Sequence, residues 1–330
     1  MKIIVTGCFG FIGINFLYFI LRKSNNNIKI IGVDKLTSSS NKSYVKLFGK
    51  YNNFKFYKTD INSKEISKII EKEKPTNIIN FAAESHVDNS INTPDKFIRT
   101  NINGVYNLLK YSLIYYKNLK KNKKKEFKFL QISTDEVYGS LLKGSAKEDH
   151  KYFPSSPYSA SKAAANHLVD AWFKTYDFPS IITYCSNNFG PFQNIEKLIP
   201  KIIDCLKKNK KIPVYGDGKN LREWIFVEDH VSAIYKILKL GKSGEKYNIG
   251  TNKKFTNLEI VKIIISEYIK INNTKNYDKL ISLITFVDDR LGHDYRYSID
   301  SSKIKDKIKW RPKTSFLTGI NKTIKWYLIN

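Results

Sequence analysis

Residues 3–13 read Ile-Ile-Val-Thr-Gly-Cys-Phe-Gly-Phe-Ile-Gly and carry the strongest fold signal in the sequence. The apolar run at their start predicts a buried strand, and a helical pattern follows from Phe11 to Arg22. Gly7, Gly10 and Gly13 fit the motif G-x-x-G-x-x-G, in which glycine lets the backbone turn tightly and approach a pyrophosphate. Because the free N–H groups at a helix start favour an anion, this stretch predicts a dinucleotide-binding loop.

An acidic residue ends the second predicted strand. The apolar run 28–33 is followed by Asp34, about 20 residues beyond the glycine loop. A carboxylate there can accept hydrogen bonds from both ribose hydroxyls and repels a 2′-phosphate, so Asp34 favours NAD over NADP. A helix cap or turn role is the alternative for Asp34. Asp60 and Ile61 are candidates for contacting adenine, although capping of the next helix suits Asp60 nearly as well.

Short apolar runs alternate with helical patterns through the first half of the chain. Further strands are predicted at 54–57, 77–81, 127–133 and 180–184, and further helices at 63–73, 94–116 and 157–176. This alternation predicts an α/β fold, a Rossmann-type doubly wound parallel sheet with helices on both faces.

Glycine-containing turns multiply after residue 186 and predict a second, smaller α+β lobe for the substrate. We expect a dinucleotide-binding domain of residues 1–186 with a returning segment at 224–250. The smaller lobe is expected to comprise 187–223 and 251–330.

The chain has 330 residues and a net charge of +27, which ordinarily suggests nucleic acid as a partner. We discount that class, because the basic residues are mostly Lys spread over the whole chain. The densest basic run, 117–128, fits a solvated loop. A residual role for the charge is to attract an anionic, phosphate-bearing substrate.

Other classes are disfavoured by what the sequence lacks. Cys8, Cys185 and Cys205 and the five His residues show no metal-ligand or disulfide spacing, so we expect neither a metal nor a disulfide. No stretch approaches the ~20 apolar residues of a membrane span, and the N-terminus does not resemble a signal peptide. We therefore expect a cytoplasmic protein without a membrane partner.

The second functional signal lies where the fifth predicted strand ends, at Thr134-Asp135-Glu136. Two adjacent carboxyl groups in a dry site can divide acid and base roles, because their repulsion keeps one protonated. On the next helix, the four-residue spacing places Tyr158 and Lys162 on one face. A cation near a phenol lowers its pKa from about 10 toward neutrality, so Tyr158 could accept a hydroxyl proton with Thr134 bonding the same hydroxyl. A capped, solvated loop is the alternative for the carboxyl pair.

Together these motifs resemble the dTDP-glucose 4,6-dehydratase family of extended short-chain dehydrogenases. The resemblance extends over nearly the whole chain, through residues 82–88, 187–193, 196–200, 216–218, Arg222, Trp224 and 289–297. The Thr-Asp-Glu triplet is its most specific part, since related 4-epimerases keep the Tyr and Lys but usually lack the acidic pair.

The resemblance implies a redox-neutral dehydration with NAD as the cofactor. Tyr158 would deprotonate the C4 hydroxyl of dTDP-glucose as the C4 hydride passes to NAD⁺. Glu136 would then remove the C5 proton while Asp135 protonates the departing C6 hydroxyl. Return of the hydride to C6 gives dTDP-4-keto-6-deoxyglucose. A homodimer through the Tyr158 helix and the helix at 94–116 is also implied.

The resemblance carries over further binding residues. Those expected to line NAD are Gly7, Gly10, Phe11, Ile12, Gly13, Asp34, Lys35, Leu36, Thr37, Asp60, Ile61, Ala82, Ala83, Ser85, Thr100, Tyr158, Lys162 and Asn188. Those expected to hold the nucleotide sugar are Ser85, Thr134, Asn187, Lys197, Leu198, Pro213, Tyr215, Arg222, Asn257, Asp289 and His293. Charge supports Arg222 and Lys197, because a diphosphate needs cations. A surface lysine and a capping or core histidine are the alternatives for Lys197 and His293.

This sequence departs from the family pattern at a few positions. Cys8 and Phe9 replace the usual Gly-Ala of the loop, and the bulk of Phe9 is expected to alter packing on the pyrophosphate. Leu291 stands where the family typically has Pro, and Asn89 replaces a usual Arg.

Three other functions compete with this interpretation. UDP-glucose differs at the base by one methyl, worth only ~1–3 kcal/mol in a pocket, so it stays an alternative substrate. A UDP-sugar 4-epimerase is disfavoured by the adjacent carboxyl groups. A non-catalytic, basic NAD-binding module acting on nucleic acid is disfavoured by the intact Thr134, Tyr158 and Lys162.

Overall fold

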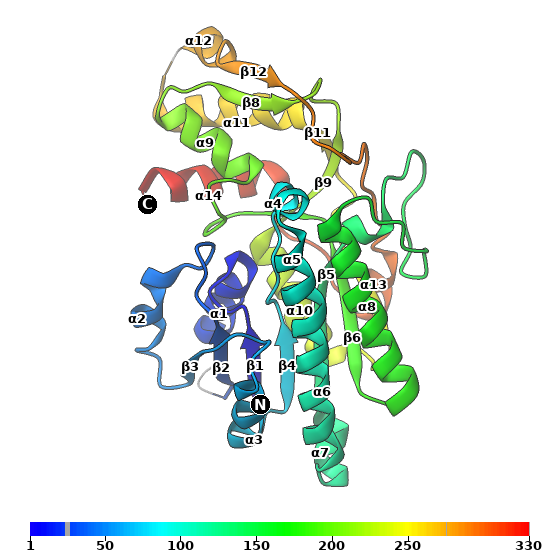
Figure 1. Cartoon of the computed structure of the whole chain (residues 1–330). Helices are drawn as coiled ribbons and strands as arrows, with labels where there is room; N and C mark the ends of the chain where they lie inside the picture. The colour runs from blue at the N-terminus through cyan, green and yellow to red at the C-terminus, as the bar shows by residue number, and fades with distance from the viewer. Residues whose placement is uncertain (24–26, 275, 330) are drawn as a thin grey trace.

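A computed structural model describes residues 1–23, 27–274 and 276–329 of the chain (Figure 1). Its larger lobe is built on a seven-stranded parallel sheet in the order β10-β6-β5-β4-β1-β2-β3. The strands are β1 (Lys2–Thr6), β2 (Lys29–Asp34), β3 (Phe54–Lys58), β4 (Asn77–Asn80), β5 (Lys128–Thr134), β6 (Ser180–Cys185) and β10 (Lys246–Ile249). The strand order reverses between β1 and β4, where doubly wound sheets bind ligands. The predicted Rossmann-type fold is confirmed.

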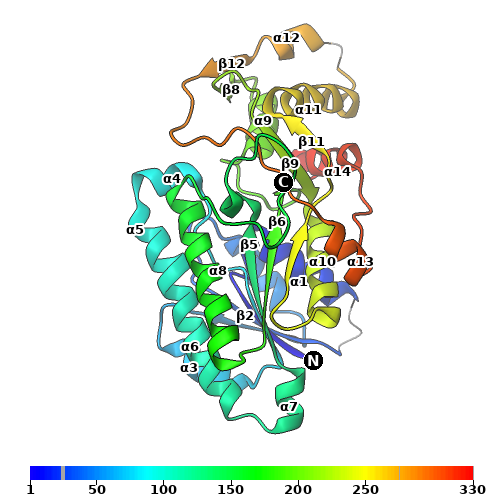
Figure 2. The same ribbon diagram turned by 90° about the vertical axis from the view of Figure 1, so that its right-hand side faces the viewer.

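Helices cover both faces of this sheet, because successive side chains of each strand point to opposite faces. In β1, Ile3 and Val5 are buried in one core with α1 (Phe11–Lys23) and α10 (Val227–Leu240). Ile4 is buried in a second core. That core also contains α3 (Glu65–Glu73), α6 (Gly104–Lys117) and α8 (Pro157–Tyr176). Figure 2 shows these two groups of helices on opposite sides of the sheet.

The helix predicted at 94–116 is present but is not uniform. It begins as α5 (Pro94–Phe97), widens into the π-helical stretch η2 (Ile98–Asn103) and continues as α6. The basic run expected to be a loop contains a short helix, α7 (Lys121–Glu126), in which no side chain is buried. The remaining short helices of this lobe are η1 (Lys42–Tyr44), α2 (Val45–Phe48), α4 (Val87–Asn92) and η3 (Asp135–Tyr138).

The smaller lobe lies over the carboxyl ends of the strands (Figure 1). It has two small sheets, one of β7 (Asn187–Phe189), β9 (Leu221–Phe226) and β11 (Lys254–Thr256), and one of β8 (Ile212–Tyr215) and β12 (Ile284–Val287). Its helices are α9 (Leu198–Lys207), α11 (Asn257–Asn272), α12 (Tyr277–Ile281) and α14 (Phe316–Ile329). They share a third core with the inner faces of β8 and β9.

The chain returns to the larger lobe twice after residue 187. The first return is α10 and β10, which fall within the expected segment, whereas β9 at its start pairs with β7 of the smaller lobe. The second return was not expected. Ile304, Ile308 and Trp310, in and after α13 (Ser302–Lys307), are buried in the core that contains α1 and α10.

The two unusual residues of the glycine loop point into the core. Phe9 is fully buried, and its ring makes edge-to-face contacts with Phe48, Phe54 and Phe56. The expectation that its bulk alters packing on the pyrophosphate is therefore wrong, because the ring lies in this aromatic cluster. Cys8 is also buried.

We predict that Gly32→Ala destabilises the larger lobe. An added Cβ would lie 2.8 Å from Cys8 Sγ and 2.9 Å from the Phe54 ring, and overpacking of this kind costs about 1–3 kcal/mol. Urea unfolding followed by circular dichroism should show a lower midpoint. In the control Gly49→Ala, the added Cβ would lie 3.4 Å from the Val45 carbonyl, so its midpoint should barely change. Equal midpoints for both variants would contradict this packing.

Candidate active site

A cleft of about 530 Å³ lies between the two lobes. One wall is formed by residues that directly follow β1 to β6, and the other by residues of the smaller lobe. The carboxyl ends of parallel strands are where folds of this kind bind ligands. The cleft is therefore the candidate active site.

The glycine loop leaves room at one end of this cleft for a phosphate-bearing group. Gly7 has φ +63, and a Cβ there would lie 2.6 Å from the Ala82 nitrogen. A Cβ on Gly13 would lie 2.2 Å from the Gly7 carbonyl oxygen, so both positions require glycine. The first N–H groups of α1 begin at Phe11 beside this cradle and suit an anion.

Asp34 lies at the far side of the cradle with its carboxylate fixed by neighbours. Its Oδ2 accepts the Phe9 N–H at 3.0 Å, and its Oδ1 accepts the Leu36 N–H at 2.7 Å and the Ser40 hydroxyl at 3.0 Å. An oriented acceptor at the cleft edge suits ribose hydroxyls, so these residues fit a dinucleotide. Asp60 also lines the cleft while its Oδ1 accepts the Asn62 N–H at 2.9 Å, as in a turn.

Nearly all residues predicted to contact the cofactor line the cleft. These are Gly7, Gly10, Phe11, Ile12, Gly13, Asp34, Lys35, Thr37, Asp60, Ile61, Ala82, Ala83, Ser85, Thr100, Tyr158, Lys162 and Asn188. Leu36 is the exception. Its backbone has φ +60, and its side chain packs against the core that contains α1.

Tyr158 and Lys162 lie on the first turns of α8, which begins with a capping box between Ser156 and Ser159. Burial raises the pKa of Tyr158 well above its usual value, and the nearby Glu136 adds to this effect. Burial lowers the pKa of Lys162 to about 8. The expected lowering of the Tyr158 pKa by Lys162 is not found within the protein itself, where desolvation dominates.

The π-helical stretch η2 braces the start of α8. Asn101 donates from Nδ2 to the Ser161 hydroxyl at 2.9 Å and to the Glu84 carbonyl at 3.0 Å. Ser161 in turn donates to the carbonyl of Tyr158 at 2.7 Å, and Lys162 Nζ donates to the Ile132 carbonyl at 2.7 Å. Sequence reasoning missed Asn101, for which the only signal was an amide inside an apolar helical pattern.

Asp135 and Glu136 lie at the floor of the cleft on η3, directly after β5. Thr134 caps this turn, because its hydroxyl accepts the Glu136 N–H at 3.3 Å and donates to Asp135 Oδ1 at 3.3 Å. Burial raises the pKa of Asp135 well above its usual value, and the charges of Glu136 and Glu223 raise it further. Asp135 is thus buried and Glu136 half-buried in the cleft, whereas the solvated-loop alternative predicted two exposed side chains.

Three cations oppose the effect of burial on Glu136. Burial raises the pKa of Glu136, whereas Arg290, Lys197 and Arg222 lower it. Lys197 reaches this position from the smaller lobe and donates to the Ser85 carbonyl at 2.9 Å. The two neighbouring carboxyl groups therefore have different surroundings, with cations gathered around Glu136.

Arg222 is held in place by the backbone of the late loop. Its guanidinium donates to the Asp294 carbonyl at 2.6 Å and to the Tyr295 carbonyl at 3.1 Å, and lies 4.3 Å from the Tyr297 ring centroid. This guanidinium is buried and faces the cleft. A fixed, buried cation is suited to binding a diphosphate.

Most residues predicted to hold the substrate also line the cleft. These are Ser85, Thr134, Asn187, Lys197, Leu198, Pro213, Tyr215, Arg222, Asn257 and His293. Asp289 does not line the cleft, but its Oδ1 lies 2.6 Å from Nδ1 of His293. Ionisable and aromatic residues of the lining to which the sequence analysis gave no role include Phe81, Glu84, His86, Asp88, Cys185, Glu196, Lys201, Arg290 and Tyr297.

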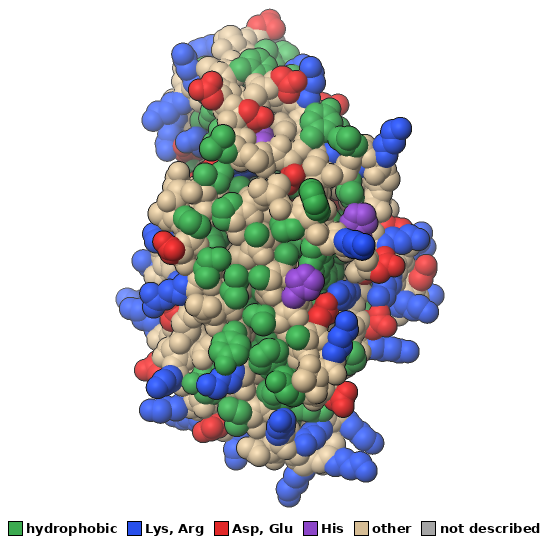
Figure 3. All heavy atoms as spheres, turned by 45° about the vertical axis from the view of Figure 1, so that its right-hand side comes forward, with side chains coloured by type: hydrophobic (Ala, Val, Ile, Leu, Met, Phe, Trp, Pro, Cys, Tyr) green, Lys and Arg blue, Asp and Glu red, His purple; other side chains and the backbone are tan. Residues whose placement is uncertain are grey.

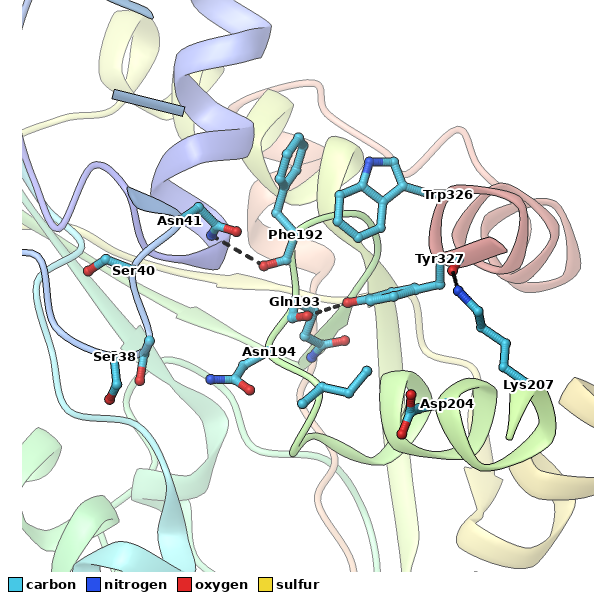
Figure 4. A pocket seen from close by; sticks show the side chains of 12 residues that line it. Ser38, Ser40, Asn41, Phe192, Gln193, Asn194, Asp204, Lys207, Trp326 and Tyr327 are labelled. Carbon is cyan, nitrogen blue, oxygen red and sulfur yellow. Dashed lines mark hydrogen bonds between the residues drawn. The ribbon is translucent and has the colours of Figure 1, made fainter. Parts of the chain in front are cut away.

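A second cavity of about 380 Å³ lies behind the cleft, between the loop at 38–41, α9 and α14 (Figure 4). The Tyr327 hydroxyl donates to the Gln193 carbonyl, and Asn41 Nδ2 donates to the Phe192 carbonyl at 3.5 Å. Ser40 and Gln193 line both cavities. The loop that contains Phe192 and Gln193 is therefore attached to both lobes behind the dinucleotide end of the cleft.

Comparisons with known proteins agree with this architecture. The family model described as GDP-mannose 4,6 dehydratase matches residues 4–323. A dTDP-glucose 4,6-dehydratase from Haemophilus influenzae is 47% identical over 100% of this chain and 98% of its own. The structure of a dTDP-glucose 4,6-dehydratase from Streptomyces venezuelae, solved with NAD, superposes with a TM-score of 0.90 at 34% identity, covering 100% and 98% of the two chains.

The corresponding enzyme from Bacillus anthracis, also solved in complex with NAD, gives a TM-score of 0.86 at 40% identity, covering 100% of this chain and 97% of its own. The resemblance seen in the sequence is confirmed: this chain belongs to the dTDP-glucose 4,6-dehydratase family.

Proposed function

We propose that this chain dehydrates dTDP-glucose to dTDP-4-keto-6-deoxyglucose, with NAD as its cofactor. The observation that carries the proposal is that the buried Asp135 and its half-buried neighbour Glu136 line the same cleft as Tyr158. A 4-epimerase needs only the tyrosine and a hydride acceptor, so the carboxyl pair favours elimination of water. Family membership supports the same reaction.

Bound NAD supplies a hydride acceptor at C4 of the sugar and, later, a hydride donor at C6. The protein's first task is proton removal at the C4 hydroxyl. Tyr158 Oη would accept that proton as a phenolate, which the positive charges of Lys162 and of the oxidised nicotinamide would stabilise against the effect of burial, and the Thr134 hydroxyl would orient the same oxygen. Lys162, held by the Ile132 carbonyl, places a positive charge on the same face of α8 as the phenol.

Asp135 and Glu136 carry out the elimination of water. The C4 ketone acidifies the C5 hydrogen, and Glu136, favoured as an anion by three cations, takes that proton. Asp135, favoured as a neutral acid by burial, donates a proton to the C6 hydroxyl, which leaves as water. Each group contributes ~10²–10⁴-fold by acid–base catalysis of this kind.

The two lobes divide the binding of the reactants. The larger lobe provides the glycine cradle and Asp34 for the dinucleotide, and its returning segment α10–β10 completes the sheet. The smaller lobe brings Lys197 and Arg222 toward the diphosphate of the sugar nucleotide. UDP-glucose stays the alternative substrate, because one methyl on the base separates the two nucleotides.

We predict that the purified protein converts dTDP-glucose to its 4-keto-6-deoxy product and that Glu136→Gln lowers turnover at least ~10²-fold, since an amide cannot accept the C5 proton. Product analysis by mass spectrometry with dTDP-, UDP- and CDP-glucose in parallel measures both. The control Glu228→Gln, at an exposed position in the first turn of α10 that does not line the cleft, should keep normal turnover. Formation of the C4 epimer without loss of water would contradict the assignment.

We predict a bell-shaped dependence of kcat on pH. Glu136 must be ionised to act, so activity is lost as pH falls through its pKa, which lies above the ordinary ~4.3 because the group is buried. Asp135 must stay protonated, so activity is lost as pH rises through its raised pKa. Initial rates at saturating dTDP-glucose test this. An acid limb below the ordinary Glu value would show that burial does not control Glu136.

We also propose that two copies of the chain form a homodimer through α6 and α8. Ile98, Tyr106 and Ile114 are large hydrophobic side chains exposed along the η2–α6 helix. Figure 3 shows hydrophobic side chains gathered in a stripe along this face. A second copy would cover that stripe with the same helices, as in other isologous dimers.

Light scattering should report a mass of two chains for the wild-type protein. Ile114→Glu places a charge in the stripe and should yield monomers, because an unpaired charge in an apolar interface is costly to desolvate. Leu240→Glu, an equally exposed position at the end of α10, should stay dimeric. A monomeric wild-type protein at micromolar concentration would rule out the dimer.

In the described part of the chain, none of the helices combines the length and hydrophobicity needed to cross a membrane. The cytoplasmic location stays a prediction.

A further inference from the structure

Glu223 is a buried carboxyl group that the proposed mechanism does not use. It is fully buried on β9, between Arg222 and Trp224, which both line the cleft. Because side chains alternate along a strand, Glu223 points to the opposite face of β9. Figures 1 and 2 both show β9 above the carboxyl ends of β5 and β6, where Asp135 begins η3.

The strand pairings place Asp135 and Glu223 close to the connection between β6 and β7, at Ser186. Asp135 directly follows Thr134, which pairs with Cys185 at the end of β6. Glu223 directly precedes Trp224, which pairs with Asn187 at the start of β7. Ser186 is the one residue between Cys185 and Asn187, so both carboxyl groups are anchored close to this short connection.

The carboxylate of Glu223 occupies space that is free because residue 250 is a glycine, without a side chain. A Cβ added to Gly250 would lie 2.0 Å from Glu223 Oε1, so any other residue there would displace the carboxylate. Ser186 donates its N–H to the Ile249 carbonyl at 3.2 Å, which fixes the end of β10 next to it. The carboxylate of Glu223 therefore has a defined position behind the floor of the cleft.

The two carboxyl groups differ in their hydrogen-bond donors. Glu223 Oε1 accepts the N–H of Thr251 at 2.7 Å and that of Asn252 at 3.0 Å, and donors of this kind favour an ionised carboxylate. Asp135 Oδ1 accepts only the Thr134 hydroxyl at 3.3 Å, and among the described residues neither Asp135 Oδ2 nor Glu223 Oε2 has a hydrogen-bond partner. The two N–H donors therefore favour a negative charge on Glu223 more than on Asp135.

We propose that Glu223 is a positioning residue whose negative charge, behind the floor of the cleft, keeps Asp135 protonated and ready to donate. The proposal rests on the proposed function, in which Asp135 protonates the departing C6 hydroxyl. Once Asp135 has lost that proton, two carboxylates are anchored near the same connection at Ser186. Their repulsion favours the return of a proton from water in the cleft, which resets Asp135 for the next turnover.

Other charges around Asp135 set the background for this effect. Desolvation by burial is the largest cause of its raised pKa, followed by Glu136 on the same turn and Glu223 on β9, while Arg222 on β9 lowers it. Other titratable groups that interact with Asp135 are Tyr158 on α8, Cys185 on β6 and Tyr138 on η3. Burial raises the pKa of Glu223 itself, opposed by the N–H groups of Asn252 and Thr251 and by Lys254 on β11.

Glu223→Gln tests the proposal, because the amide keeps an oxygen for the two N–H groups but removes the charge. The alkaline limb of the kcat–pH profile should move down by about one pH unit, with near-normal turnover on the acid side of that limb. Glu267→Gln is the matched control, since Glu267 is a buried carboxyl of α11 bonded to Lys270 at 2.6 Å and should leave the profile unchanged. A uniform loss of activity with an unmoved limb would assign Glu223 a structural role only and overturn the proposal.

A second variant keeps the test decisive if Glu223→Gln does not fold. Lys254 pairs with Glu223 across β11 and β9 and lowers the pKa of Glu223, so Lys254→Gln makes the negative charge on Glu223 less favourable and should move the alkaline limb down by a smaller amount than Glu223→Gln. A limb that stays in place or moves up would overturn the proposal. Product analysis of the wild-type protein separates the two claims: no 4-keto-6-deoxy product contradicts the proposed function, whereas normal product with an unmoved limb contradicts only the role of Glu223.

Discussion

The rest of this structure depends on one constraint: two consecutive carboxyl groups at the end of β5, Asp135 buried and Glu136 half-buried, lie together in the cleft. Repulsion between them, and the loss of water around both, would neutralise both groups unless their surroundings differed. The fold supplies that difference. Cations from the smaller lobe surround Glu136, whereas Asp135 faces a further carboxyl group and few hydrogen-bond donors. One side chain can thus remove a proton while its neighbour supplies one.

This requirement explains why neither lobe can form the site alone. The sheet and α8 place the carboxyl pair and Tyr158 in the cleft, but Lys197, Arg222 and Arg290 all come from segments after β6. Contacts between distant segments hold them in place, such as the bonds from Arg222 to the carbonyls of the late loop. The charge balance on Glu136 therefore depends on how the two lobes pack together, and substrate binding at the lobe junction is coupled to catalysis.

Local sequence patterns were enough to predict six of the seven strands of the large sheet, whereas β10 was expected only as part of a returning segment. Nearly all of the binding residues carried over from the family resemblance line the cleft, but the cleft also has lining residues that were not predicted. Features that depend on distant contacts were not predicted from the sequence. These are the π-helical stretch at 98–103, the hydrogen bonds from Asn101 to the start of α8, and the return of Trp310 to the larger lobe. The ring of Phe9 was misjudged for the same reason, since its three aromatic neighbours lie about 40 residues further along the chain.

The central claim is that Asp135 and Glu136 hold opposite protonation states while the substrate is bound. Neutron diffraction from deuterated crystals of the complex with NAD and a non-reactive dTDP-sugar reads this directly, because deuterium atoms are visible on carboxyl oxygens. The account predicts a deuteron on Asp135 and none on Glu136. A deuteron on Glu136, or two bare carboxylates, would contradict it.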